Sequence, residues 1–219
     1  TISDANVSEE GETDLEVLKQ QSNYYLCDYS ATPESCRATT LGNAKNTLNI
    51  NYHKNSENLG FARNATKVVS LAKGKFTWLV GDDDLILPRA LKSLLQILRT
   101  NPDIEIFFIN SYYLNSQYLD NFTTKNIKFN ELNSLSKVKN NKIVNFWDLI
   151  DPHVSWEFLI GIFLIVFKTS KWLESSKRVD VKKLEEKKIW SNFENTCFFP
   201  IVNAYAFKNS KAFICAEPL

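Results

Sequence analysis

The sequence is poor in the residues that mark several common classes of protein. Its 219 residues include no methionine, two histidines and four cysteines. The cysteines (Cys27, Cys36, Cys197 and Cys215) form no CxxC pair, and no histidine lies at metal-ligand spacing from them, which argues against a structural zinc site. We expect free thiols in a reducing compartment. Because even an initiator methionine is lacking, we expect natural sequence upstream of Thr1, unless methionine positions are missing from the sequence.

Long apolar runs and an excess of charge of one sign are also absent. The longest apolar run is the ten-residue segment Phe158–Phe167. That is about half of what a membrane-spanning helix needs, so it predicts a buried strand or core segment. The formal net charge of +1 gives no electrostatic reason to expect a nucleic-acid partner. No secretory signal opens the sequence.

Alternating patterns between residues 48 and 113 predict an α/β domain. Strand patterns occupy residues 48–52, 75–80 and 104–114. Between them, residues 55–74 predict a turn and a helix, and a second helix runs from Pro88 to about residue 100. This order of strand, helix, strand, helix and strand favours a mostly parallel sheet with helices on both faces.

The pattern is looser after Tyr113. Residues 115–145 are polar and predict an excursion with short strands. A helical turn is predicted at residues 146–150, a short helix at 169–176, helical structure around Pro200 and a closing strand at 211–219.

Three adjacent carboxylates, Asp82, Asp83 and Asp84, follow the second predicted strand. One aspartate there would cap the next helix, a contribution of about 0.3–1 kcal/mol from the helix dipole. Three repel one another, which favours a positively charged ligand instead. In an extended stretch Asp82 and Asp84 point the same way, and Mg²⁺ or Mn²⁺ prefers such oxygen ligands beside substrate phosphates. Because ligands bind beyond the carboxyl ends of strands in open α/β sheets, the triplet predicts a metal and phosphate site, with capping as the alternative.

Two further polar segments are expected at the same edge of the sheet. The segment NLGFARN (Asn58–Asn64) leads from a strand into a helix; Gly60 suits a tight turn, and Arg63 suits a phosphate or carboxylate partner. Near the start, Asp4 and Asn6 follow a scrap of strand, where an acidic residue commonly holds a base or a ribose hydroxyl. By itself, each segment is more typical of an ordinary turn.

The segments SDANVSEEGET, NLGFARN and WLVGDDDLILPRAL, in this order, resemble the motifs of the family 2 glycosyltransferases. The resemblance implies the GT-A fold, a Rossmann-like α/β fold with a mostly parallel sheet flanked by helices. Residues 1–113 would form the nucleotide-sugar-binding half, and residues 114–219 the acceptor-side half of the same domain. The second half is similar more loosely, through FLIGIFLIVFKTSKW and NTCFFPIVNAYAF. The family's apolar first strand is lacking, so we expect it upstream of Thr1.

The resemblance implies transfer of a sugar from a UDP-, dTDP- or GDP-sugar to a hydroxyl of a glycan or lipid-linked acceptor, usually with inversion. A bound Mg²⁺ or Mn²⁺ would neutralise the charge on the leaving diphosphate. The implied metal ligands are Asp82 and Asp84, and the implied nucleotide-sugar contacts are Asp4, Asn6, Asn58, Gly60, Arg63, Asp82 and Asp83. We expect a bacterial, cytoplasmic enzyme of surface polysaccharide or lipooligosaccharide synthesis, with peripheral contact to the inner membrane and no nucleic-acid partner.

The acceptor hydroxyl needs a general base, which the family usually supplies as an aspartate or glutamate from the second half. Glu194 in NFENT is the first candidate, followed by Asp151 and then His153 in DPHVSW. An exposed helix carboxylate is the simpler interpretation of Glu194, and a loop position that of His153. The acidic pair that customarily precedes the base helix is not evident.

Two other interpretations of the triplet stay open. A GT-A-like module could bind a nucleotide sugar without turning it over, although the intact triplet argues for turnover. A phosphatase of the HAD type also carries Asp-x-Asp at a strand end, but it wants Thr or Val shortly after the second aspartate, where this sequence has Leu85 and Ile86.

Overall fold

The computed structural model describes most of the chain from His53 onward. The described residues are 53, 55–81, 84, 86, 87, 90–114, 132–155, 157–159, 161–184, 190 and 192–219. The strand predicted at 48–52, the triplet members Asp82 and Asp83, and the N-terminal pair Asp4 and Asn6 lie outside them. In the described part of the chain, no helix is both long enough and apolar enough to span a membrane.

The described strands form one mixed sheet in the order β1-β4-β2-β5-β3. They are β1 (Phe76–Trp78), β2 (Ile106–Ile109), β3 (Lys142–Asn145), β4 (Ile165–Lys168) and β5 (Lys211–Cys215). β2 and β5 are parallel, whereas β4 is antiparallel to both β1 and β2, and β3 is antiparallel to β5. β1 and β2 therefore run in the same direction, as predicted.

The predicted mostly parallel sheet needs correction among these strands, because three of their four pairings are antiparallel. The reason is that β4, from the second half of the chain, lies between β1 and β2 and prevents them from pairing directly. Local periodicity cannot reveal this insertion, since β4 pairs with residues about 60 to 90 positions earlier in the chain.

The helices follow the sequence patterns closely. They are α3 (Phe61–Leu71), α4 (Ala90–Thr100), α5 (Thr169–Ser176), α6 (Phe193–Thr196) and α7 (Phe198–Phe207), with 3₁₀ turns η4 (Phe146–Leu149), η5 (Glu157–Leu159), η6 (Ile162–Leu164) and η7 (Val181–Leu184). The predicted apolar stripe of α3 is buried at Ala62, Ala65, Val68 and Val69. This helix ends at Leu71, slightly before the predicted stop at Gly74. Pro200 lies in the first turn of α7, where a missing N–H costs nothing.

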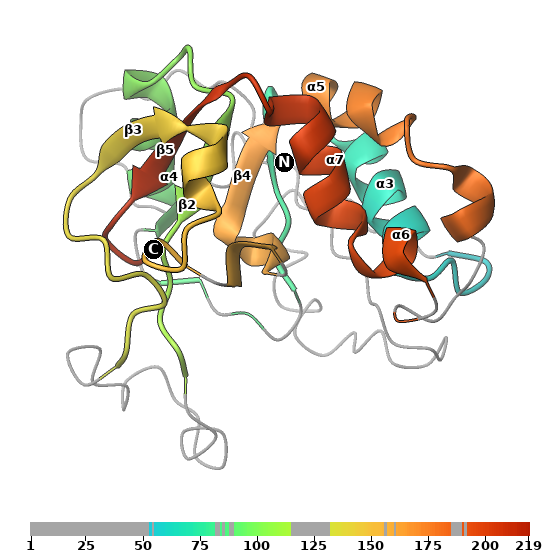
Figure 1. Ribbon diagram of the computed structural model, residues 1–219, viewed down its shortest axis with the longest axis horizontal. Coiled ribbons are helices and arrows are strands. Elements are labelled where there is room, and N and C mark those ends of the chain that lie inside the picture. The colour runs from blue at the N-terminus through green and yellow to red at the C-terminus, as the bar shows by residue number, and fades with distance from the viewer. Residues whose placement is uncertain are drawn as a thin grey trace, which may run out of the picture.

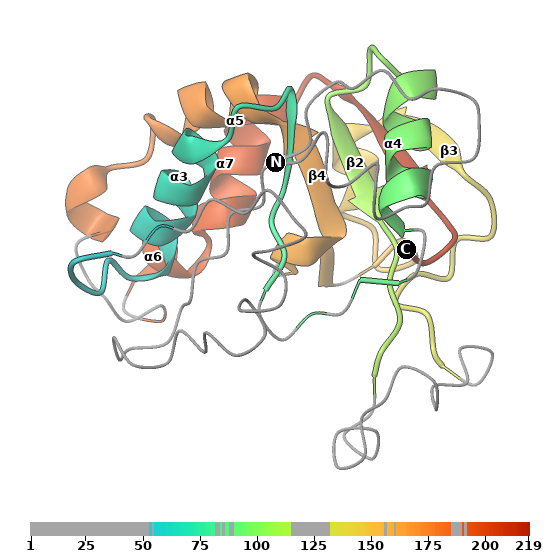
Figure 2. The same cartoon turned by 180° about the vertical axis from the view of Figure 1, so that it is seen from behind.

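The central strands β4, β2 and β5 are buried on both faces, and each contributes alternate residues to two separate cores. On β2, Ile106 and Phe108 pack with α3, α5 and α7, whereas Phe107 and Ile109 pack with α4. The first group of helices lies together beside β4 in Figure 1, and α4 lies in front of β2 in the reverse view of Figure 2. The period of two along a strand thus places helices on both faces, as the apolar strand patterns predicted.

Two of the four cysteines lie in the described residues, and both Cys197 and Cys215 are free thiols. Cys215 is buried at the end of β5, and this burial raises the pKa of its thiol to about 11. It is therefore protonated at neutral pH and packs as a small apolar side chain, as predicted.

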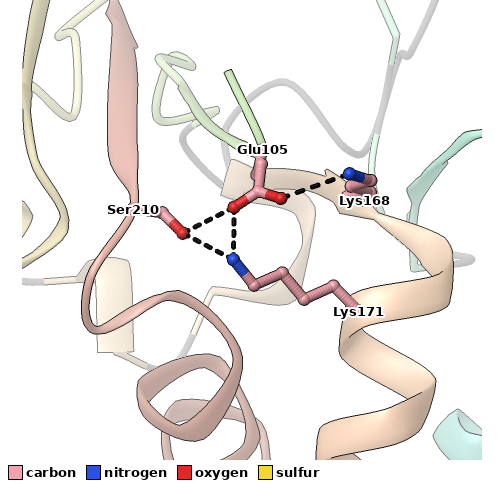
Figure 3. Close-up of polar contacts among 4 residues, drawn as sticks. All are labelled: Glu105, Lys168, Lys171 and Ser210. Atoms are coloured by element: carbon pink, nitrogen blue, oxygen red, sulfur yellow. Dashed lines mark hydrogen bonds and ion pairs between the residues drawn. The ribbon is translucent and has the colours of Figure 1, made fainter. Parts of the chain in front are cut away.

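A polar cluster fastens the amino end of β2 to its neighbours (Figure 3). The Glu105 carboxylate accepts hydrogen bonds from Lys168 Nζ at 3.2 Å, from Ser210 Oγ at 2.7 Å and from Lys171 Nζ. The cluster joins the end of β4, helix α5 and the turn before β5, all at one end of the sheet. Burial raises the pKa of Glu105, but the hydrogen bonds from Lys171, Ser210 and Lys168 outweigh it, so that the pKa is lowered overall.

We expect the Glu105→Gln substitution to lower the free energy of unfolding by about 1–3 kcal/mol at neutral pH, because charge-assisted hydrogen bonds to a half-buried carboxylate are lost. The contribution of a carboxylate with a lowered pKa is fully present above its unfolded-state pKa and is lost as the pH falls through the folded-state pKa. Urea unfolding between about pH 7 and pH 3 should therefore show a steeper acid loss in the natural chain than in the variant. The matched control is Glu174→Gln, an exposed carboxylate paired with Lys177. Equal pH profiles for natural chain and Glu105→Gln would contradict the assignment.

Candidate functional site

A cavity of about 470 Å³ opens at the carboxyl ends of β1 and β2. Trp78 and Val80 reach it from the end of β1, and residues 109–114 reach it from the end of β2. The segment before β4 contributes Phe163, and the segment after β5 contributes Leu219. The cavity therefore lies at the sheet edge where ligands bind in open α/β domains.

Asp84 brings the last carboxylate of the acidic triplet into this cavity. Its Oδ2 accepts a hydrogen bond of 2.7 Å from the backbone N–H of Gly81. Asp84 is half-buried at the cavity. The position is the one that the sequence predicted for a metal ligand, namely directly beyond the carboxyl end of a buried strand.

Glu157 is a second carboxylate in the same cavity and was not among the sequence-based candidates. Ser155 Oγ donates to its Oε2 at 3.0 Å, and the backbone N–H of Glu157 in turn donates to Ser155 Oγ at 3.2 Å. The turn closes when Gly161 N–H donates to the Glu157 carbonyl at 2.7 Å. A Cβ at Gly161 would lie 2.8 Å from Leu164 Cδ1, so glycine allows this close turn.

Asn110 holds together the segments that form the cavity wall. It is 1% exposed at the end of β2 and uses its whole side-chain amide. Nδ2 donates to Ser134 Oγ at 2.7 Å and to the Ala216 carbonyl at 2.6 Å, and Oδ1 accepts from the backbone N–H groups of Ser111 and Ser136, both at 2.9 Å. Its carbonyl also accepts from Leu219 N–H at 3.1 Å. One buried amide thus orders the end of β2, residues 134–136 and the segment after β5.

The remaining wall is largely aromatic and aliphatic. Trp78 uses its indole N–H in a 2.6 Å hydrogen bond to the Phe163 carbonyl, which fixes the ring at the cavity. Tyr112 and Tyr113 follow β2, and Tyr113 is half exposed. Fixed rings of this kind provide flat apolar surface with little conformational entropy to lose on binding.

The predicted residues of the NLGFARN segment form the turn before α3 and do not line the cavity among the described residues. Gly60 caps α3 at a φ of 73°, a conformation that favours glycine, and its N–H donates to Asn58 Oδ1 at 2.8 Å. Arg63 lies on the first turn of α3, with its guanidinium 3.9 Å from the Glu57 carboxylate. These contacts show an ordinary turn into a helix. The binding of a nucleotide sugar by this segment stays a prediction.

None of the three candidate bases from the sequence is among the described residues that line the cavity. Glu194 lies in α6 and forms an ion pair with Lys183. The hydrogen bond from Lys183 lowers the pKa of Glu194, which makes it a weaker base. Asp151 accepts from His153 N–H at 2.8 Å in a surface turn, and His153 is exposed.

The donor set suits a hard divalent cation. Asp84 supplies a carboxylate at the cavity, and Mg²⁺ usually takes one or two carboxylates beside phosphates and water. Within the described ranges, no three His, Cys, Asp or Glu side chains are grouped to hold a metal ion on their own. A cation here would therefore share its coordination with a ligand, or with Asp82 and Asp83, which lie outside the described residues.

The described residues form an α/β domain whose mixed sheet has a cavity at the carboxyl ends of β1 and β2, and Asp84 and Glu157 are among the residues that line it. Residues 28–155 match the model of the family described as glycosyl transferase family 2. The chain belongs to glycosyl transferase family 2.

Two relatives show how far the similarity extends. An uncharacterized glycosyltransferase of Methanocaldococcus jannaschii is 32% identical over 85 residues, which is 38% of this chain and 29% of that protein. The crystal structure of S. aureus TarS 1–349 in complex with UDP-GlcNAc matches with a TM-score of 0.56 at 13% identity, over 84% of this chain and 45% of that one. This match shows that the fold is that of the GT-A glycosyltransferases. The chain spans less than half the length of either relative.

We expect the Asn110→Asp substitution to lower the free energy of unfolding by about 2–5 kcal/mol, because an oxygen replaces the amide nitrogen that donates to Ser134 Oγ and the Ala216 carbonyl in a buried site. Asn141→Asp is a matched control, since the Asn141 Oδ1 accepts from Ala216 N–H at 2.8 Å and aspartate preserves that bond. Chemical denaturation measures both variants. Similar losses in the two would contradict the special role of Asn110.

Proposed function

We propose that this chain carries the site of a glycosyltransferase that moves a sugar from a nucleotide-sugar donor to an acceptor hydroxyl, with inversion and with a divalent cation. The observation that carries the proposal is the cavity at the carboxyl ends of β1 and β2, which Asp84 and Glu157 both line. Membership of glycosyl transferase family 2 supports the reaction class, and the UDP-GlcNAc bound to TarS supports a nucleotide-sugar donor.

Charge balance supports the need for a cation. A nucleoside diphosphate brings negative charge, which increases when the bond to the sugar breaks, and the cavity wall already holds two carboxylates. The described lining residues include no Lys, Arg or His. Asp84, with Asp82 of the same triplet, would hold Mg²⁺ or Mn²⁺, which when bound neutralises the leaving diphosphate.

The remaining carboxylate has the position of a general base. Glu157 shares the cavity with Asp84, whereas Glu194 pairs with Lys183 and Asp151 accepts a hydrogen bond within its own turn. Ser155 fixes one oxygen of Glu157, and orientation of this kind is what proton transfer from an acceptor hydroxyl requires. We therefore assign Glu157 as the base, with Glu194, Asp151 and His153 as the competing candidates.

We also propose the acceptor, the product and the cellular location, on the basis of the family. The acceptor is a glycan or a lipid-linked glycan, and the product is a surface polysaccharide or lipooligosaccharide. The donor is a UDP-, dTDP- or GDP-sugar used in the cytoplasm, and a lipid-linked acceptor would bring the protein to the inner membrane surface. The alternative is a module of the same fold that binds the donor without turnover; it predicts binding but no release of nucleoside diphosphate.

We expect thermal stabilisation by one class of nucleotide sugar that depends on Mn²⁺ and is lost in Asp84→Ala, since a ligand that binds only the folded state raises the melting temperature. A panel of UDP-, dTDP- and GDP-sugars with and without Mn²⁺ tests this by differential scanning fluorimetry. Glu174→Ala, an exposed carboxylate on α5, is the control. Metal-dependent stabilisation that survives Asp84→Ala would remove Asp84 from the proposed cation site.

We expect Glu157→Gln to slow the release of nucleoside diphosphate from the stabilising donor by about 10²–10⁴-fold with little change in donor affinity, the usual contribution of a general base. A coupled assay of donor hydrolysis without acceptor measures the rate. Glu174→Gln is again the exposed control. If Glu194→Gln instead abolishes turnover and Glu157→Gln does not, the base is Glu194.

A further inference from the structure

The cavity wall has a charge pattern that bears on which sugar it accepts. Glu157 has no cationic partner among the described residues, and Ser155 is its hydrogen-bond donor. The side-chain amide of Asn110, which also lines the cavity, already donates hydrogen bonds to Ser134 Oγ and to the Ala216 carbonyl. The described residues of the cavity wall therefore present hydrogen-bond-accepting carboxylates and aromatic rings to a ligand. They include no positively charged side chain.

This pattern distinguishes sugars by a single functional group. An ionised carboxylate only accepts hydrogen bonds, so Glu157 is satisfied by a sugar hydroxyl, which donates. A carboxylate on the sugar has no proton to donate and carries the same charge as Glu157, so that the two groups repel in a partly desolvated space. The rings of Trp78 and Tyr113 offer flat surface to the C–H face of an uncharged pyranose.

We infer that this site selects donors whose sugar carries no carboxylate, of the neutral hexose or N-acetylhexosamine class, and that Glu157 is the residue that rejects glycuronic acid donors. The inference rests on the proposed function, and it adds a specificity role for Glu157 to its role as base. A cation held by Asp84 leaves the argument intact, because it would neutralise the diphosphate, which neutral and acidic sugar donors share.

The test uses two matched pairs of donors, UDP-glucose with UDP-glucuronate and GDP-mannose with GDP-mannuronate. Members of a pair share the nucleotide and the ring and differ only in the group at C6. Dissociation constants are measured by calorimetry with Mn²⁺ on the natural chain. In the pair whose nucleotide is bound, we expect the neutral donor to bind about tenfold more tightly or better.

The variant arm assigns the discrimination to one residue. Glu157→Gln keeps the size of the side chain and removes its charge, so the preference should fall to about threefold or less, while Glu174→Gln should retain it. Equal binding of both members by the natural chain, or a preference unchanged in Glu157→Gln, overturns the inference and leaves the proposed function standing. Binding of neither pair overturns the inference, and the proposed function falls with it only if no UDP-, dTDP- or GDP-sugar of the panel stabilises the protein.

Discussion

Burial of β2 on both faces is the constraint on which the rest of the described structure depends. Its four residues, Ile106–Ile109, are at most 1% exposed, so apolar layers must cover both sides of the sheet. The polar residues that flank such a strand, Glu105 and Asn110, must find hydrogen-bond partners at its two ends. Glu105 does this at the amino end with Lys168, Lys171 and Ser210, and Asn110 does it at the carboxyl end. Both residues cross-link distant parts of the chain. At Asn110, which is 1% exposed, a lost partner would leave a buried amide group unsatisfied.

The cavity also lies at the carboxyl end of β2. Asn110 therefore both stabilises the fold and shapes the cavity wall. The amide is saturated and cannot serve a ligand, yet it sets the course of the residues that can, among them Tyr112 and Leu219. The site therefore depends on a side chain that we assign no chemical role. The opposite end of the strand, around Glu105, has its own dense polar cluster but lies away from the cavity, which fits a purely structural task.

The electrostatics of the cavity link the chemistry to the choice of substrate. Asp84 and Glu157 bring two carboxylates to the cavity, and in the proposed function a divalent cation accompanies the donor and neutralises its diphosphate. The same wall favours hydrogen-bond donors over acidic groups. Glu194, by contrast, is already neutralised by Lys183, and a carboxylate in an ion pair is poorly suited to accept a proton. The position of each carboxylate, more than its presence in the sequence, decides its proposed role.

The sequence by itself determined the local features: the helices α3 and α4, the buried strands β1 and β2, the turn at Gly60 and the carboxylate that follows β1 at Asp84. These depend on periodicity and turn chemistry within a few residues, which a pattern records directly. Only the tertiary structure decided that β4 lies between β1 and β2, because strand pairing across 60 to 90 positions leaves no local trace. That insertion carries Glu157 and Gly161, just before β4, to the carboxyl end of β1. Local sequence patterns therefore gave no sign of Glu157 as a site residue, because only the pairing of β4 brings it to the cavity that Asp84 also lines.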